Sequence, residues 1–358
     1  MATTKRNFVH IIWDSFCSLK LTIFLLISLA LSSIIGTVLP QGQLPPEYLA
    51  QISPVKLQIY AKLGFFDMYH SWWFIALLYI FSLNLISCSI KRLPHVIKFI
   101  TEPTLVLGES MRSTFSLKKE IRLSAPVDVS QEKLAAFLGK EFATPVISEH
   151  SGEYHLFAQK SAWSRLGVYV VHLSILVIFV GAIIGSLFGY KGFVTIVEGS
   201  SISSVESRSG NQIPLGFELR CDQFSVTFYN TGAPKEFKSI LTVLENGQPI
   251  KDYTNARVVV NDPLTYKGIT FYQSSYGQEM GKMYTGLQVA KDPGVWVVWL
   301  GCTMMIIGIF VAFFMSHKRV WIIVSKGHAR MYANASKNQA AFQMQFENLS
   351  ELLNNLKI

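Results

Sequence analysis

The chain has 358 residues, of which 50% are hydrophobic and only 15% are charged, and its formal net charge is +9. Soluble domains carry about 25% charged residues, so an ordinary soluble enzyme is excluded. The 25 Phe, 14 Tyr and 7 Trp exclude a disordered chain. Four cysteines without a Cys-x-x-Cys pair or a Cys/His cluster exclude a disulfide scaffold, a zinc ribbon and a thioredoxin-like site. The composition indicates an integral membrane protein.

Four stretches without Asp, Glu, Lys or Arg are long enough to cross about 30 Å of hydrocarbon as helices. They cover residues 21–39, 71–90, 166–190 and 293–316. The first apolar run is too long for a cleaved signal peptide. The predicted fold class is therefore a polytopic α-helical membrane protein with four transmembrane helices.

The basic residues predict the orientation of the spans. Segments 1–20, 91–165 and 317–358 hold 20 Lys/Arg and 11 Asp/Glu, whereas segments 40–70 and 191–292 hold 12 of each. Because Lys and Arg accumulate in cytoplasmic segments, we expect both termini and the domain 91–165 in the cytoplasm and residues 40–70 as a short extracytoplasmic loop. The basic charge thus reflects topology in a lipid bilayer, and no nucleic-acid partner is expected.

Residues 191–292, between the third and fourth spans, are predicted to form a β-rich, sandwich-like extracytoplasmic domain. Short β-branched and aromatic runs alternate there with turn signals. The runs are 193–197, 217–219, 224–229, 239–244, 256–260 and 269–273. Asn246-Gly247 predicts a tight hairpin, and Cys221 has no partner for an internal disulfide. On the inner side we expect a helix at 131–142, a strand at 154–157 and an amphipathic helix at 338–356.

Eight histidines are present, and six of them are expected to be solvated or to face lipid headgroups. These six are His10, His95, His150, His155, His317 and His328. The other two, His70 and His172, are the candidate ligands. They lie at the outer end of the second span and inside the third span.

His172 lies about 10 Å below the inner boundary of its span. An ionisable side chain at that depth is functional by default, and neutral imidazole is a natural axial ligand of heme iron. The alternative is a histidine that bonds a neighbouring Ser or a backbone carbonyl. Gly181, Gly185 and Gly189 form a double Gly-x-x-x-Gly series, with Gly181 and Gly185 about 180° and 220° around the helix from His172, which predicts a helix-packing face.

His70 lies in Tyr69-His70-Ser71-Trp72-Trp73-Phe74. It is either a solvated residue of the interfacial aromatic belt or a heme ligand whose neighbours Trp72 and Trp73 flank the porphyrin. The depths of His70 and His172 differ by roughly 20 Å, whereas two ligands of one iron lie about 4 Å apart. Each histidine then needs a second ligand from elsewhere, most simply from another subunit.

Other chemistry is not indicated by any motif. The sequence has no Walker loop, no Gly-x-Gly-x-x-Gly after a strand, no His-Glu-x-x-His and no Gly-x-Ser-x-Gly. It also has no Cys-x-x-Cys-His, so the chain is not itself a c-type cytochrome. No catalytic residue is assigned.

Several stretches together carry a resemblance to one family. The most distinctive are Val260–Leu264 and Phe271–Gly277. The others are Ser18–Leu21, Gly36-Thr37, Pro40-Gln41, Tyr69–Phe74, Asn84-Leu85, Cys88-Ser89, His172–Ser174 and Thr231–Phe237. On these residues the chain resembles the ResB/CcsB family of cytochrome c biogenesis (system II) proteins over essentially its full length.

The resemblance implies a subunit of the system II cytochrome c synthase in the bacterial cytoplasmic (inner) membrane. Its implied partner is a CcsA/ResC-type protein that carries a WWD segment, which is absent here because Trp72-Trp73 is followed by Phe74. Such a pair carries heme b across the membrane for attachment to the CxxCH thiols of apocytochrome c. The implied axial ligands are His172 and His70, in a non-catalytic or co-catalytic subunit.

Two other classes stay open on the sequence. One is a membrane-bound b-type cytochrome in quinone-linked electron transfer, which needs ligand pairs at similar depth in one chain. The other is a structural anchor for the outer domain that makes no contact with heme.

Overall fold

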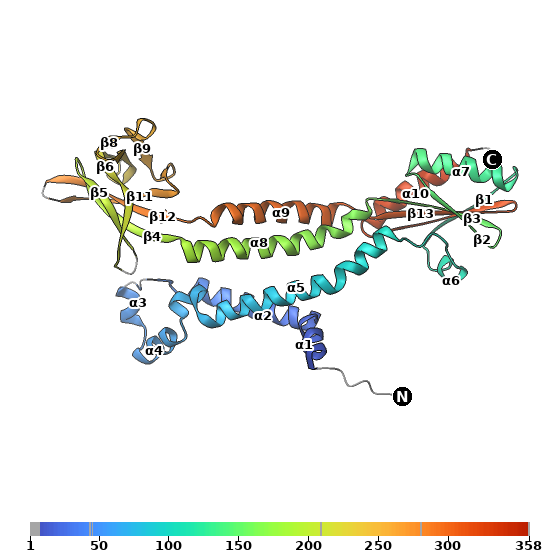
Figure 1. The fold of residues 1–358 in the computed structure, drawn as a ribbon, viewed down its shortest axis with the longest axis horizontal. Helices are drawn as coiled ribbons and strands as arrows, with labels where there is room; N and C mark the ends of the chain where they lie inside the picture. Colours follow the sequence, from blue (N-terminus) through green and yellow to red (C-terminus); the bar gives the residue numbers. More distant parts are fainter. Residues whose placement is uncertain (1–7, 43, 45, 208–209, 280, 357–358) are drawn as a thin grey trace. The chain divides into compact units, whose positions relative to one another are not determined.

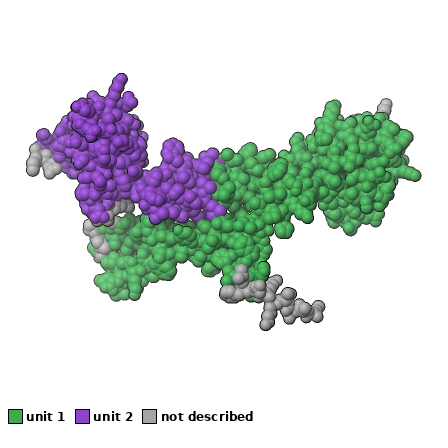
Figure 2. Space-filling model, in the orientation of Figure 1, with its two compact units in different colours: residues 1–174, 304–358 green, residues 175–303 purple. Residues whose placement is uncertain are grey.

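The computed structural model describes residues 8–42, 44, 46–207, 210–279 and 281–356. Residues 1–7 of the predicted segment 1–20 and the last two residues of the predicted tail lie outside this description. The chain divides into two compact units (Figure 2). Residues 1–174 and 304–358 form the first unit, and residues 175–303 form the second.

In the described part of the chain, four helices are long and apolar enough to cross a membrane, as predicted (Figure 1). They are α2 (Leu19–Val38), α5 (Trp72–Thr101), α8 (Gly167–Phe188) and α9 (Val295–Phe314). Helix α5 continues beyond the predicted span 71–90. Charges at Lys91 and Arg92 end the apolar run, but they do not end the helix, because both residues are good helix formers.

A buried amide joins the first two long helices. Asn84 of α5 is completely buried, and its Nδ2 donates to the carbonyl of Phe16 at 2.6 Å, at the end of α1 (Phe8–Phe16). Thr22 Oγ1 of α2 donates to Asn84 Oδ1 at 2.8 Å. Between α2 and α5 the chain forms α3 (Pro46–Gln51), α4 (Pro54–Lys62) and the 3-10 helix η1 (Phe65–His70), where the sequence predicts only a short loop.

Segments 91–165 and 317–358, predicted as a domain and a separate tail, build one antiparallel sheet. Its strand order is β1-β14-β13-β3-β2. The strands are β1 (Leu117–Arg122), β2 (Val146–His150), β3 (Glu153–Lys160), β13 (Lys318–Ser325) and β14 (His328–Ala335). The predicted helices are confirmed as α7 (Val127–Glu141) and α10 (Gln339–Asn354).

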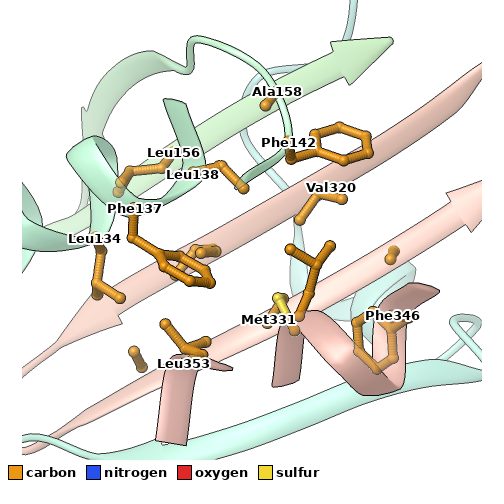
Figure 3. Close-up of a cluster of buried hydrophobic side chains, with 14 of the residues drawn as sticks. Leu134, Phe137, Leu138, Phe142, Leu156, Ala158, Val320, Met331, Phe346 and Leu353 are labelled. Atoms are coloured by element: carbon orange, nitrogen blue, oxygen red, sulfur yellow. The ribbon is translucent and has the colours of Figure 1, made fainter. Parts of the chain in front are cut away.

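The inner strands β3, β13 and β14 of this sheet are largely buried on both faces. On one face, side chains of α7 and α10 pack with Leu156, Val320 and Met331 of the strands (Figure 3). On the other, Trp321 packs with Leu107 and its Nε1 donates to the Thr104 carbonyl at 2.9 Å. Residues 320–324 of the central strand β13 are therefore a continuous buried apolar run without alternation. The charged residues Lys318 and Arg319 separate this run from the preceding span.

The second unit contains a nine-stranded antiparallel sheet that follows α8 and precedes α9 in the sequence. Its order is β10-β11-β12-β4-β5-β6-β7-β8, and β9 pairs with β7. The strands are β4 (Tyr190–Val197), β5 (Ser201–Ser207), β6 (Gln212–Phe228), β7 (Pro234–Glu245), β8 (Gln248–Pro249), β9 (Ala256–Val259), β10 (Leu264–Tyr266), β11 (Ile269–Glu279) and β12 (Lys282–Lys291). Asn246-Gly247 forms the predicted hairpin between β7 and β8.

The prediction of a sandwich is wrong in one respect, because the strands form one continuous sheet that folds over itself. Ser239 of β7 donates to Gln273 Oε1 of β11 at 2.6 Å, and Ser239 Oγ lies 2.9 Å from Thr285 Oγ1 of β12. All three side chains are buried. The Gln273 of the distinctive Phe-Tyr-Gln-Ser-Ser-Tyr stretch thus holds together two parts of one sheet.

The glycine series of α8 lies against the chain before and within α9. A Cβ atom added to Gly181 would lie 2.8 Å from Val298 Cγ2, and one added to Gly185 would lie 2.5 Å from Asp292 Oδ1. Both distances are shorter than a carbon or oxygen contact allows. Small residues are what permit this close approach of helices in lipid.

We expect Gly181→Val to lower the thermal stability of the purified protein in detergent, because the new side chain forces α8 and α9 apart. Overpacking of this kind costs about 1–3 kcal/mol. Ala182→Val is the matched control, since Ala182 is exposed on the same helix. Equal melting temperatures for the two variants would contradict the close packing at Gly181.

We expect Cys221 to resist alkylation in the folded protein. Its thiol is completely buried, and burial, reinforced by Glu198 and Asp222, raises the pKa of Cys221 to about 12. Because the thiolate is the reactive form, iodoacetamide should label Cys221 only after denaturation, as read by peptide mass spectrometry. Rapid labelling under native conditions would show that this core opens.

Candidate functional site: a cavity at His172

A cavity of about 520 Å³ lies in the first unit, with α2, α5 and α8 contributing to its walls. Leu19, Leu85, Val96, Val168 and Tyr169 supply apolar surface to these walls. The polar and charged lining comprises Thr22, Asn84, Cys88, Ser89, Arg92, Ser164, Arg165, His172, Ser336 and Lys337. Its volume falls in the range of about 300–1,000 Å³ found for sites that bind organic ligands.

His172 is half-buried and lines this cavity from α8. Its Nδ1 lies 3.1 Å from Ser89 Oγ of α5. The alternative of a histidine that bonds a neighbouring serine is thus realised at one nitrogen. Across the described part of the chain, Nε2 has no hydrogen-bond partner. When Nδ1 donates its proton to Ser89, Nε2 carries a free lone pair, which is the arrangement found in metal-ligating histidines.

His70 stands apart from the cavity. Its side chain is 70% exposed, and its Nδ1 lies 2.6 Å from Asp67 Oδ1 within η1. Seventeen residues of α5 separate Trp72 from Ser89, the contact of His172, which is a rise of about 26 Å. The separation predicted from the sequence therefore holds within this unit, and the two imidazoles do not share one iron.

The two tryptophans after His70 differ from each other. Trp72 is 79% exposed, whereas the Trp73 Nε1 donates to the Leu63 carbonyl at 2.9 Å. The Trp73 ring also meets Phe65 edge-on, with centroids 6.1 Å apart. Neither indole has a ring contact with His70 among the described residues, so only Trp72 is free to flank a planar ligand.

Two of the six histidines predicted to be solvated are buried, which corrects that prediction. His155 is completely buried on β3, and burial lowers its pKa. Neither ring nitrogen has a hydrogen-bond partner within the described ranges, although Nε2 lies 3.9 Å from Glu153 Oε2. His317, which lies between the end of α9 and the start of β13, is 1% exposed. Burial, reinforced by Arg165 and Arg319, lowers the pKa of His317 to about 4.

His317 belongs to a chain of hydrogen bonds that ends at the cavity wall. Arg165 Nε donates to His317 Nδ1 at 2.8 Å, so the ring proton lies on Nε2, which is 3.0 Å from Gln159 Oε1. Gln159 Nε2 then donates to the Ile100 carbonyl at 3.2 Å. A neutral imidazole thus fixes Arg165, which lines the cavity.

Sequence reasoning missed Ser89, Arg92, Arg165 and Lys337 as lining residues of the cavity. Ser89 belongs to one of the stretches that carry the family resemblance. Arg92 follows the second predicted span and Arg165 precedes the third, and this position at the end of a span is the one sequence signal that could have pointed to them. Lys337 comes from the chain after β14, and no local pattern connects it with His172. No group of three His, Cys, Asp or Glu side chains in the described segments could hold a metal ion.

Four helices of the described residues are long and apolar enough to cross a membrane, and together with the two sheets they indicate a membrane protein. Residues 19–283 and 277–347 match the ResB-like family. The chain belongs to this family.

Named relatives agree with that assignment. A cytochrome c biogenesis protein CcsB of Nostoc sp. is 24% identical over 98% of this chain and 93% of its own length. A CcsB of Synechococcus sp. is 30% identical over 77% of this chain and 57% of its own length. A cytochrome c biogenesis protein Ccs1 of Rhodomonas salina is 30% identical over 72% of this chain and 58% of its own length. Among solved structures, the cytochrome c heme lyase CcmF has a TM-score of 0.33 at 12% identity, covering 82% of this chain and 45% of that protein.

We expect the stability of the protein to fall as the pH drops below the ordinary histidine pKa of 6.5, partly through His317. In the unfolded chain His317 gains a proton near pH 6.5, whereas in the folded chain it stays neutral until about pH 4. Between these values the unfolded state is favoured by up to about 3 kcal/mol, and above them the contribution vanishes.

Thermal unfolding from pH 7.5 to pH 4.5 measures this effect. His317→Gln should lose less stability than the wild-type protein across that range, and His95→Gln, at an exposed position of α5, should follow the wild-type curve. Parallel curves for all three proteins would contradict a buried neutral His317.

Proposed function

We propose that this chain is a heme-handling subunit of the system II cytochrome c synthase, in which His172 binds heme b during its passage through the membrane. The observation that carries the proposal is the free Nε2 of His172 in a cavity of about 520 Å³. The names of the relatives, cytochrome c biogenesis protein CcsB and Ccs1, support the pathway.

The residues of the cavity fit heme as a cargo. Apolar side chains suit the faces of a flat macrocycle, and Ser89 holds the ring of His172 through Nδ1. His172 is the only histidine that lines the cavity in the described part of the chain. A heme held by His172 would take any second protein ligand from another protein, which favours a transferable cargo over a permanent cofactor.

We further propose that both termini are cytoplasmic and that the nine-stranded domain is extracytoplasmic, between the third and fourth spans. The excess of Lys and Arg in segments 1–20, 91–165 and 317–358 supports this orientation. In this arrangement the cavity opens near the cytoplasmic side, and His70 and Trp72 lie near the outer side. There His70, whose Nδ1 is held by Asp67, would serve a second heme site.

The partner in this proposal is a CcsA/ResC-type membrane protein with the WWD segment, and the acceptor is apocytochrome c with reduced CxxCH thiols. No catalytic residue is assigned to this chain, so its contribution is to bind and position heme. Electron transfer as a b-type cytochrome is less well supported, because the distance of about 26 Å along α5 prevents His70 and His172 from forming a ligand pair.

The test is an absorbance spectrum of the complex purified with its partner. We expect His172→Ala to lose the heme signal, and added imidazole to restore it by replacing the lost ligand. Ser89→Ala should weaken heme binding by about tenfold, as for other supports of a metal-ligating histidine. His95→Ala is the control, since His95 is exposed and lies outside the cavity. Unchanged heme content in His172→Ala would overturn the proposal and favour a structural anchor.

A further inference from the structure

Three cationic side chains line the His172 cavity without a carboxylate partner. They are Arg92 of α5, Arg165 before α8, and Lys337 after β14. Within the described ranges no Asp or Glu oxygen lies within 4.0 Å of their side-chain nitrogens. By contrast, Lys91, next to Arg92, pairs with Asp14 at 2.8 Å. The cavity therefore combines apolar walls, one imidazole and a set of positive charges without counter-charges.

Arg165 is the most firmly held of the three. Its guanidinium carbon lies 4.5 Å from the centroid of the Phe99 ring, and its Nε donates to His317. Its two terminal amino groups have no hydrogen-bond acceptor in the described part of the chain. A planar guanidinium with both amino groups free is suited to bidentate binding of a carboxylate.

We infer that Arg165, together with Arg92 and Lys337, binds the carboxylates of the ligand whose flat apolar body meets His172. This inference rests on the proposed function and deepens it, because heme b carries two propionate side chains. The cavity then selects for a dianionic tetrapyrrole by charge, in addition to ligating its metal. His317 and Gln159 act as positioning residues for Arg165.

A phospholipid headgroup is the competing occupant, since basic residues near membrane surfaces attract anionic lipids. Two observations favour the carboxylates of a cavity ligand. Arg165 is half-buried and held by Phe99 and His317, and it lines the same cavity as His172. A snorkelling side chain that serves lipid needs no such fixed orientation.

The experiment compares heme b with its dimethyl ester, in which both propionates are neutral. Both are titrated into the full-length protein in phosphatidylcholine nanodiscs, and binding is read from the Soret band. We expect Arg165→Gln to weaken heme b binding by about tenfold and to leave ester binding within about twofold. Arg165→Lys should give an intermediate loss of heme b affinity, because lysine keeps the positive charge but lacks the planar guanidinium that binds a carboxylate through two N–H groups. Arg122→Gln, at an exposed position outside this cavity, is the control.

His317→Ala tests the positioning role. It should reduce the preference for heme b over the ester, as Arg165→Gln does, whereas a general loss of structure would weaken both ligands equally. His172→Ala should weaken the binding of both ligands, because both contain the iron that His172 ligates in this proposal.

The failures are distinguishable. If the wild-type protein binds neither ligand, the proposed function fails and this inference fails with it. If wild type binds both equally and Arg165→Gln changes neither, the inference is overturned while His172 ligation stands. If Arg165→Gln changes heme b affinity only in nanodiscs that contain phosphatidylglycerol, the occupant of the basic residues is a lipid headgroup, and this outcome also overturns the inference.

Discussion

A polar side chain inside a hydrocarbon layer must find a partner, and this requirement organises the helices of the first unit. Asn84 satisfies its amide with the Phe16 carbonyl and with Thr22 of α2, so one buried group fixes α5 against its neighbours. His172 satisfies one nitrogen with Ser89. Its Nε2 has no hydrogen-bond partner in the described part of the chain, and the cavity that His172 lines has room for a ligand that binds this nitrogen.

The two sheets hold the ends of α8 and α9 in the same way. In the first unit β3 leads to α8, β13 follows α9, and these two strands pair with each other. In the second unit β4 follows α8, β12 precedes α9, and they also pair. Within the first unit Gly308 allows close contact with Val171 of α8, and within the second unit Gly181 allows close contact with Val298 of α9.

Local patterns in the sequence were sufficient for features that depend on neighbouring residues. Apolar runs predicted the four long helices, Asn246-Gly247 predicted its hairpin, and periodicity predicted α7 and α10. Features that depend on distant residues were missed. His317 looked like a residue at the membrane surface, but its ring is buried and bonds Arg165 and Gln159, which lie more than 150 residues earlier in the chain. Arg165 and Lys337, which are 172 residues apart in the sequence, line the same cavity.

The two-segment sheet has a consequence for biosynthesis. Strands β1 to β3 are made before the third and fourth long helices, but β13 and β14, which complete the sheet, come from the last part of the chain. Synthesis must therefore pass residue 337 before His317 can contact Arg165 and before Lys337 can reach the cavity. Until then the four long helices can form, but the part of the cavity wall that Ser336 and Lys337 supply is missing.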